Sequence, residues 1–294
     1  MHERLFGPVR FIPGKKNGKY PYCHSVYIEG PKILIDPASD RERLIRLKEE
    51  SGVDMVWLSH WHEDHISDLD LFEDVPLWIS EADADPLSDS EIFLDWYGMK
   101  EGEFRDGFRD VLVQQFHFKP RKADRFLTGG ETLAFKNMTV DVIAAPGHTP
   151  GHTAFFFREP KVLFLGDYDL TRFGPWYGDR DSDIDDVLAS VDALRQISAD
   201  VWLSCHETGV FLENPGKLWT DYLGVIHYRD DRLMKLLETP KTLNEIIDAG
   251  IVYNRPGTTE SFFTFGEWAI MTKHLERNID KGLVRYHENR YMSV

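Results

Sequence analysis

The segment WLSHWHEDHISDL, residues 57–69, contains three histidines, two aspartates and one glutamate within ten positions, directly behind an apolar run. His60 and His62 alternate in an extended stretch, so their imidazoles point the same way and can reach one ion. Asp64 and His65 follow at the turn into a helix and can face a second ion. Imidazole and carboxylate suit zinc, iron or manganese. The segment therefore predicts a metal site, since without a metal nothing would offset the repulsion between its carboxylates.

A site with two metals needs ligands from other loops at the same edge of the sheets. Three polar residues follow predicted apolar strands closely: His148 after 139–145, Asp167 after 161–166 and His206 after 199–205. A carboxylate can bridge two metals, and Asp167 is the candidate. This predicts two ligand sets, which are His60, His62, His148 and Asp167 on one metal, then Asp64, His65, Asp167 and His206 on the other.

Two adjacent divalent ions would lower the pKa of a bridging water, so that hydroxide exists near neutral pH and attacks a carbonyl or phosphoryl centre. Asp64 can hold this hydroxide through a hydrogen bond and later accept a proton. Asp64 is therefore the predicted catalytic residue. Zinc is the leading metal, with iron and manganese as alternatives, because the ligand types suit all three.

Four residues that follow Asp167 are candidates for the wall of a substrate pocket: Tyr168, Arg172, Trp176 and Tyr177. Packing in the interior is the alternative interpretation for each of them. The aromatic residues Phe93, Trp96 and Tyr97 could cover an apolar acyl group, although packing in a core is the favoured interpretation there.

The composition limits the partners. The chain has 294 residues, 42% of them hydrophobic, and a formal net charge of −16. Such an acidic chain is poorly suited to gripping a phosphate backbone or an anionic membrane surface, because both are bound mainly by Lys and Arg. Two cysteines form no CxxC pair, and no apolar run is long enough to span a membrane. A small-molecule substrate and a cytoplasmic location are the resulting predictions.

The elements that position the candidate ligands alternate between strands and helices, which predicts an α/β fold with helices packed over sheets. Helices are predicted over 41–52 and 182–197, and Ser182 with Asp185 resembles a capping box. Residues 81–120 are expected to be a mostly helical insertion. Two domains are predicted: 1–214, which is catalytic, and 215–294, where three helices and a hairpin give a winged-helix-like outline.

Four motifs in this order resemble the metallo-β-lactamase superfamily over roughly residues 20–212. They are HWHEDH, PGHTPGH at 146–152, LGD at 165–167 and the late His206. The resemblance implies a four-layer αβ/βα sandwich with a dinuclear metal site at one edge of the sheets and seven ligands at the positions above. It also implies that Asp36, at the end of an early strand, supports the ligands, and we expect the same of His152.

The resemblance leaves several functions open. Asp167 argues against antibiotic hydrolysis, since zinc β-lactamases lack this bridging residue. A hydrolase of a small thioester, ester or lactone is the leading hypothesis, and glyoxalase II shares the HxHxDH and GHTPGH motifs. A phosphodiesterase is the alternative, because lactamase-like endoribonucleases append a similar C-terminal outline. A persulfide dioxygenase with a single iron and a binding module without activity are less favoured. A homodimer is plausible.

Overall fold

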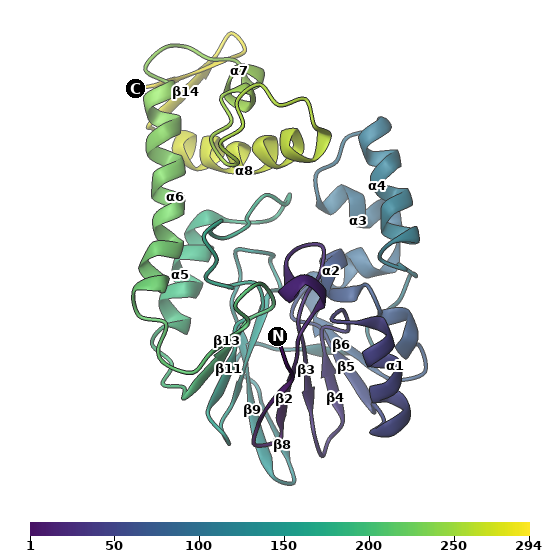
Figure 1. The fold of residues 1–294 in the computed structure, drawn as a ribbon. Coiled ribbons are helices and arrows are strands. Elements are labelled where there is room, and N and C mark those ends of the chain that lie inside the picture. Colours follow the sequence, from purple (N-terminus) through teal and green to yellow (C-terminus); the bar gives the residue numbers. More distant parts are fainter.

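Two mixed sheets lie face to face with helices on both outer sides in the computed structural model, which describes residues 1–294 (Figure 1). The strands are β1 (Arg4–Phe6), β2 (Val9–Ile12), β3 (Ser25–Ile28), β4 (Ile33–Ile35), β5 (Met55–Trp57), β6 (Leu77–Ser80), β7 (Arg125–Leu127), β8 (Thr132–Phe135), β9 (Met138–Ala144), β10 (Thr153–Phe157), β11 (Val162–Phe164), β12 (Val201–Leu203), β13 (Val210–Phe211), β14 (Val284–His287) and β15 (Arg290–Ser293). The helices are α1 (Arg41–Glu50), α2 (Glu63–Ile66), α3 (Ser90–Trp96), α4 (Glu103–Gln114), α5 (Ile184–Leu194), α6 (Lys217–Leu236), α7 (Leu243–Asp248) and α8 (Ser261–Asp280).

The first sheet has the order β1-β2-β3-β4-β5-β6-β7, and its strands β4 to β7 are parallel. The second has the order β13-β12-β11-β10-β9-β8, in which only β11 and β12 are parallel. Because β5 and β11 belong to the parallel portions, their carboxyl ends lead to one edge of each sheet. The loops behind these two strands carry candidate ligands from both sheets.

Three hydrophobic clusters fill the spaces between the layers. The cluster between the sheets includes Val26, Ile28, Trp57, Phe155 and Phe164. A second cluster joins the first sheet to α1, α3 and α4, with Leu34, Leu44, Leu47, Phe93 and Leu112. The third joins the second sheet to α5, α6 and α8, with Leu163, Val187, Val191, Ile226 and Ile270. The predicted four-layer sandwich is confirmed.

Side-chain caps determine where two of the outer helices begin. The Asp40 carboxylate accepts a hydrogen bond from the Arg43 amide at 2.8 Å and so caps α1. In α5 the cap is Asp183, which accepts from the Asp186 amide, and not the predicted Ser182. Ser182 is buried, and its hydroxyl donates instead to the carbonyl of His148 at 2.6 Å. The predicted N-cap was therefore wrong by one residue, because the Ser182 hydroxyl bonds to the loop that carries His148 and does not cap α5.

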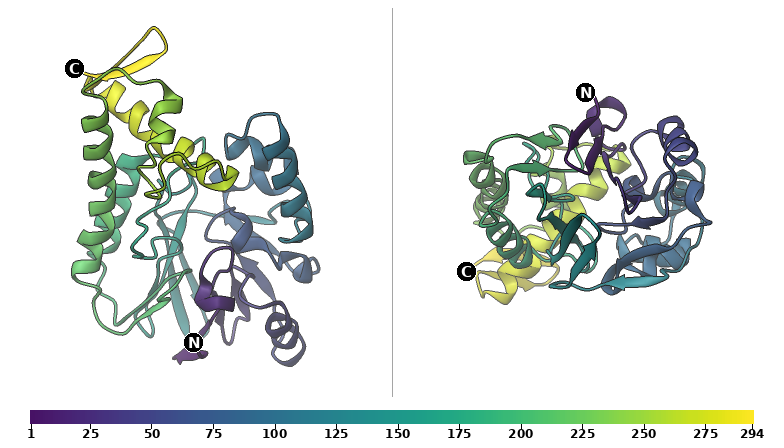
Figure 2. Two further views of the ribbon diagram at one scale, coloured as in Figure 1. Left: turned by 45° about the horizontal axis from the view of Figure 1, so that its top comes forward. Right: turned by 90° about the horizontal axis from the view of Figure 1, so that it is seen from below.

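Residues 81–120 contain two helices, α3 and α4, as expected for the insertion, together with short 3₁₀ turns. The C-terminal region consists of α6, α7, α8 and the β14–β15 hairpin. This region lies over the edge of the sheets, and Figure 2 shows α8 extending toward the insertion. The winged-helix likeness and the domain boundary at residue 214 stay predictions. No helix combines the length and the apolar character that crossing a membrane would require.

Candidate metal centre and substrate cavity

Three imidazoles face one point at the edge of the sheets. The Nε2 atoms of His60 and His148 and the Nδ1 atom of His62 lie 3.1 Å from one another in every pair. The Oδ2 atom of Asp167 lies 3.4 Å from the His148 nitrogen and 3.8 Å from the His60 nitrogen. A tetrahedral ion with bonds of about 2.0–2.1 Å separates its ligand atoms by roughly 3.3 Å. The spacing of these four side chains therefore fits a metal ion of zinc size.

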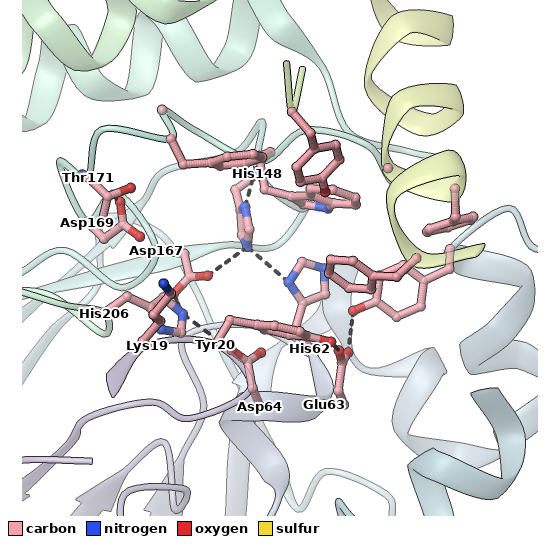
Figure 3. A pocket seen from close by; sticks show the side chains of 18 of the residues that line it. Lys19, Tyr20, His62, Glu63, Asp64, His148, Asp167, Asp169, Thr171 and His206 are labelled. Carbon is pink, nitrogen blue, oxygen red and sulfur yellow. Dashed lines mark hydrogen bonds and ion pairs between the residues drawn. The ribbon is translucent and has the colours of Figure 1, made fainter. Parts of the chain in front are cut away.

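A second group lies beside the first and includes the other carboxylate oxygen of Asp167. Its Oδ1 atom lies 3.0 Å from Nε2 of His65 and 3.2 Å from Nε2 of His206. The Oδ2 atom of Asp64 lies 3.4 Å from the same His206 nitrogen. Asp167 thus offers one oxygen to each group, as a bridging carboxylate does, and Figure 3 shows it between His148 and His206. The structure brings all seven predicted ligands together.

The far ring nitrogen of each of the five imidazoles has a hydrogen-bond partner. The partners are the Ser59 hydroxyl for His60, Asp179 for His62, Asp36 for His65, the Trp176 carbonyl for His148 and the Gly18 carbonyl for His206, at 2.7–3.0 Å. Four of these partners are carbonyl or carboxylate oxygens, so those far nitrogens carry hydrogen and the near ones present lone pairs. Lone pairs that face one point repel each other unless a cation lies between them.

Two buried atoms of the second group support the same conclusion. Nε2 of His65 and Oδ1 of Asp167 lie 3.0 Å apart, and neither forms a hydrogen bond with the other or with any other group. Buried polar atoms are rarely left without one. A divalent cation bound at this position would satisfy both atoms at once, so the donor set and its geometry fit a dinuclear metal centre.

The surroundings of the centre shift the pKa values of two of its imidazoles in opposite directions. Burial, reinforced by His62, lowers the pKa of His148 to about 4, so this ring is neutral as a metal ligand must be. Burial alone would lower the pKa of His62, but Asp179, Glu63 and Asp64 together raise it to about 9. In the metal-free protein His62 would hold a proton, which a metal would displace on binding.

The predicted supporting residues lie directly behind the ligands. Asp36 accepts hydrogen bonds from the amide and hydroxyl of Ser59 at 2.8 and 2.7 Å, besides its contact with His65. Nε2 of His152 accepts from the Asp167 amide at 3.1 Å. Gly166 directly precedes Asp167 and has φ +60°. A Cβ atom at Gly166 would meet His152 Nε2 at 2.4 Å. Only glycine fits this position, which aims Asp167 into the centre.

Asp179 is a supporting residue that the sequence did not predict. Its Oδ2 atom accepts from Nε2 of His62 at 2.8 Å, and its Oδ1 atom accepts from the indole of Trp176 at 2.8 Å. Both oxygens are used, and the residue is almost fully buried. Nothing in the local pattern distinguishes Asp179 from the nearby exposed Asp181 and Asp183, so only the fold identifies it.

A third buried carboxylate, Asp83 in the insertion, holds the loop that carries His148. It accepts hydrogen bonds from the Thr149 hydroxyl and the Gly151 amide, both at 2.6 Å. Burial raises the pKa of Asp83 to about 7. The insertion is thereby tied to the metal centre through a loop of the second sheet.

The four candidate substrate residues lie in different environments in the structure. Trp176 lines the cavity beside the ligands, and Arg172 is exposed outside that lining. Tyr168 is fully buried, and its hydroxyl donates to the carbonyls of Ala145 and Pro146. Tyr177 is also fully buried, with its hydroxyl within hydrogen-bond distance of Arg229 and His274. The two tyrosines therefore pack in the core, while Trp176 faces the cavity.

A cavity of about 400 Å³ opens directly over the ligands. Its polar end contains the side chains labelled in Figure 3, among them His62, Asp64, His148, Asp167 and His206. The rest of the lining is mostly aromatic and comes from the insertion, from the loop behind Asp167, from the segment between α7 and α8, and from α8, with Tyr97, Met99, Phe104, Phe108, Phe173, Trp176, Tyr253, Phe262 and Phe265.

Two facing sheets and paired ligand groups bridged by one aspartate define a metallohydrolase. A model of the metallo-beta-lactamase superfamily matches residues 20–206. The chain belongs to this superfamily, and it is one of its hydrolases.

Known proteins resemble different portions of the chain. It is 26% identical to the beta-lactamase-like protein 2 homolog of Caenorhabditis elegans over 262 residues, which cover 85% of this chain and 78% of that protein. It is 32% identical to the hydroxyacylglutathione hydrolase GloC of Haemophilus influenzae over 140 residues, covering 46% of this chain and 59% of GloC. The structure of the metallo-beta-lactamase family protein TTHA1429 from Thermus thermophilus superposes with a TM-score of 0.75 at 22% identity, covering 99% and 100% of the two chains. At that identity the superposition shows the fold alone.

Proposed function

We propose that the chain hydrolyses a small thioester, ester or lactone with two divalent metal ions bound in its paired ligand groups. The observation that carries this proposal is the shared Asp167, whose two oxygens face the two groups at the floor of a largely apolar cavity. The activity in the name of GloC, on hydroxyacylglutathione, supports a thioester as one substrate class. When bound, the two ions would acidify a water molecule and polarise the carbonyl oxygen of the substrate.

The residues of the chain supply orientation and proton transfer. Asp64 lines the cavity, and its carboxylate lies against His206. We assign it the role of orienting the attacking water and accepting its proton. The hydrogen bonds from the imidazoles to Asp36, Asp179 and the backbone keep the ligand nitrogens aimed at the metals, which stiffens the centre during turnover. Zinc is the metal we propose, with iron and manganese as alternatives, because the ligand types suit all three.

The charge of the cavity disfavours the phosphodiesterase. Lys19 is the single Lys or Arg among the lining residues, which include the carboxylates of Glu63, Asp64, Asp167, Asp169 and Glu207. A phosphate backbone is bound mainly through several Lys and Arg side chains. An uncharged carbonyl substrate fits this surface better.

Metal content and substrate preference test the proposal together. Protein purified from unsupplemented medium would be analysed by mass spectrometry and assayed on thioester, ester, lactone and bis-p-nitrophenyl phosphate substrates. About two metals per chain with turnover of a carbonyl substrate is the expected result. Turnover of the phosphodiester alone would replace the substrate class, and one iron without hydrolysis would overturn the second metal site.

A variant pair tests the catalytic role of Asp64. Asp64→Asn should lower kcat by about 10²-fold or more, the usual contribution of a general base. Asp74→Asn, at an exposed position paired with Lys48, should leave kcat unchanged. If both variants kept full activity, Asp64 would not be the catalytic residue.

A further inference from the structure

We infer that the cavity selects an unsubstituted hydrocarbon acyl group, alkyl or aryl, and that the insertion and α8 together form the wall that recognises it. This inference rests on the proposed hydrolase function and specifies its substrate. The metal centre occupies one end of the cavity, so a carbonyl bound there has its remaining bulk in the aromatic part. A volume of about 400 Å³ lies within the range of small-molecule sites.

The wall forms where two distant segments meet. The ring of Phe104, in the insertion, lies 5.1 Å from the ring of Phe265 on α8, measured between centroids. The ring of Tyr97 lies 6.4 Å from Phe265 and almost perpendicular to it, at 76°. These are the distances and angles of favourable aromatic pairs. All three residues line the cavity, so the contact between the segments is also part of the binding surface.

The hydroxyl groups of Tyr20 and Tyr97 are already used. Tyr20 and Tyr97 both donate a hydrogen bond to the buried carboxylate of Glu63. The ring of Tyr97 also stacks on His62 at an interplanar angle of 15°. Both tyrosines consequently present ring surfaces to the cavity.

The apolar surface continues to the opening of the cavity. The rings of Tyr20 and Phe262 stack at 5.9 Å and 27°, and both side chains are partly exposed. Phe173 lies 5.5 Å from Tyr253, so the loop behind Asp167 joins the same surface. A hydroxyl or carboxylate on the acyl chain would lose its water against the rings of Phe104, Phe262 and Phe265 without gaining a hydrogen bond from them, which is unfavourable.

The inference assigns the two halves of the substrate to different parts of the cavity. Lys19, the lone cation of the lining, is exposed at the polar end of the cavity (Figure 3). A polar or anionic leaving group can extend past Lys19 into solvent. The apolar wall is then left for the acyl half, so selectivity should follow the acyl chain.

Two series of p-nitrophenyl and alkyl esters test this on the metal-loaded full-length protein. The first varies the acyl group from acetyl to octanoyl on a constant leaving group, and the second varies the alcohol of acetate esters. We expect kcat/KM to rise about fourfold for each methylene in the acyl series, as burial of a methylene predicts, and to stay nearly flat in the alcohol series. A lactoyl ester should be at least about tenfold poorer than the propionyl ester.

Variants of the wall provide the second measurement. Phe265→Ala should move the preferred acyl length upward, and Phe265→Trp should lower kcat/KM for hexanoyl relative to acetyl by about tenfold. Phe263→Ala is the matched control, because Phe263 is on the same helix but outside the lining. Its length profile should match that of the unaltered protein.

The outcomes separate the two proposals. Turnover that is independent of acyl length, or that depends on the alcohol alone, overturns the acyl inference and leaves the hydrolase assignment intact. A preference for lactoyl over propionyl overturns it as well. The absence of turnover on every ester, thioester and lactone would instead overturn the proposed function.

Discussion

The Asp179 carboxylate accepts a hydrogen bond from Nε2 of His62 at 2.8 Å while its other oxygen accepts from the indole of Trp176. This arrangement connects a ligand of the proposed metal centre to a residue of the cavity lining. It also fixes Nδ1 of His62 as the atom that faces the metal, since the other ring nitrogen carries the shared hydrogen.

Replacing Asp179 with asparagine should weaken the centre. Asparagine has one acceptor oxygen for the two donors that face it, so its amide group would oppose either His62 or Trp176. We expect metal affinity and kcat/KM to fall by about 10–100-fold, measured by chelator competition and steady-state kinetics. The control is Asp181→Asn, which removes only an exposed pair with Arg180. Equal effects of the two variants would refute the role of Asp179.

Arg229 should stabilise the loop that carries Trp176. This buried side chain of α6 donates to the carbonyls of Phe173 and Pro175, at 2.7 and 3.1 Å. In Arg229→Met both carbonyls lose their partner, and the free energy of unfolding should fall by about 2–4 kcal/mol in urea titrations. Arg232→Met, on the same helix, should cost less than about 1 kcal/mol because Arg232 is partly exposed. Similar losses in both variants would argue against a special role for Arg229.

His24 should make the fold sensitive to acid. Burial lowers its pKa to about 4, and Nδ1 accepts from the Gly14 amide at 2.8 Å, so the native ring is neutral. The unfolded chain protonates His24 below about pH 6.5, and stability therefore falls as pH drops from about 6.5 to 4. The contribution amounts to about 3 kcal/mol over that window.

The His24 contribution can be isolated by difference. Between pH 7.5 and 5, at a fixed metal concentration, the free energy of unfolding should decrease less in His24→Gln than in the unaltered protein. His287→Gln, in the exposed β14–β15 hairpin, should behave like the unaltered protein. A pH dependence that is unchanged by His24→Gln would exclude this residue as the source.

Removing the metals should destabilise the folded state. The ligand atoms of His60, His62 and His148 then lose the divalent ion between them, and only the proton on His62 replaces it. Zinc at about 1,000 times its dissociation constant should restore about 4 kcal/mol, seen as a higher Tm than in chelator. Asp167→Asn should reduce this difference, because each group loses a charged ligand atom. A zinc-independent Tm would speak against bound metal in the native protein.

The clustering of the seven proposed ligands could be predicted from the sequence because their positions follow local rules. His60 follows β5 and Asp167 follows β11, and the ends of these strands meet at one edge in any fold of this type. His62 alternates with His60 along the extended stretch, so both face the first ion position. His65 follows in α2 and faces the second. No knowledge of distant contacts was required.

The supporting residues and the cavity could not be predicted in the same way. Asp179 meets His62 across 117 positions of sequence, and the meeting of Phe104 with Phe265 has no local signal. Tyr168 and Tyr177 were plausible pocket residues because they are aromatic and follow Asp167, yet packing turns both toward the core. Zinc as the metal, the homodimer and the cytoplasmic location stay predictions.

The stacked rings of Tyr20 and Phe262 come from opposite ends of the chain. During synthesis on a ribosome, every proposed ligand up to His206 emerges before α8 has been made. A nascent or truncated chain can therefore acquire metal while its cavity is still open to water. The proposed metal centre and the acyl wall are therefore completed at different points of synthesis, and loss of α8 would remove the Phe262 and Phe265 side of that wall together with its contribution to the core.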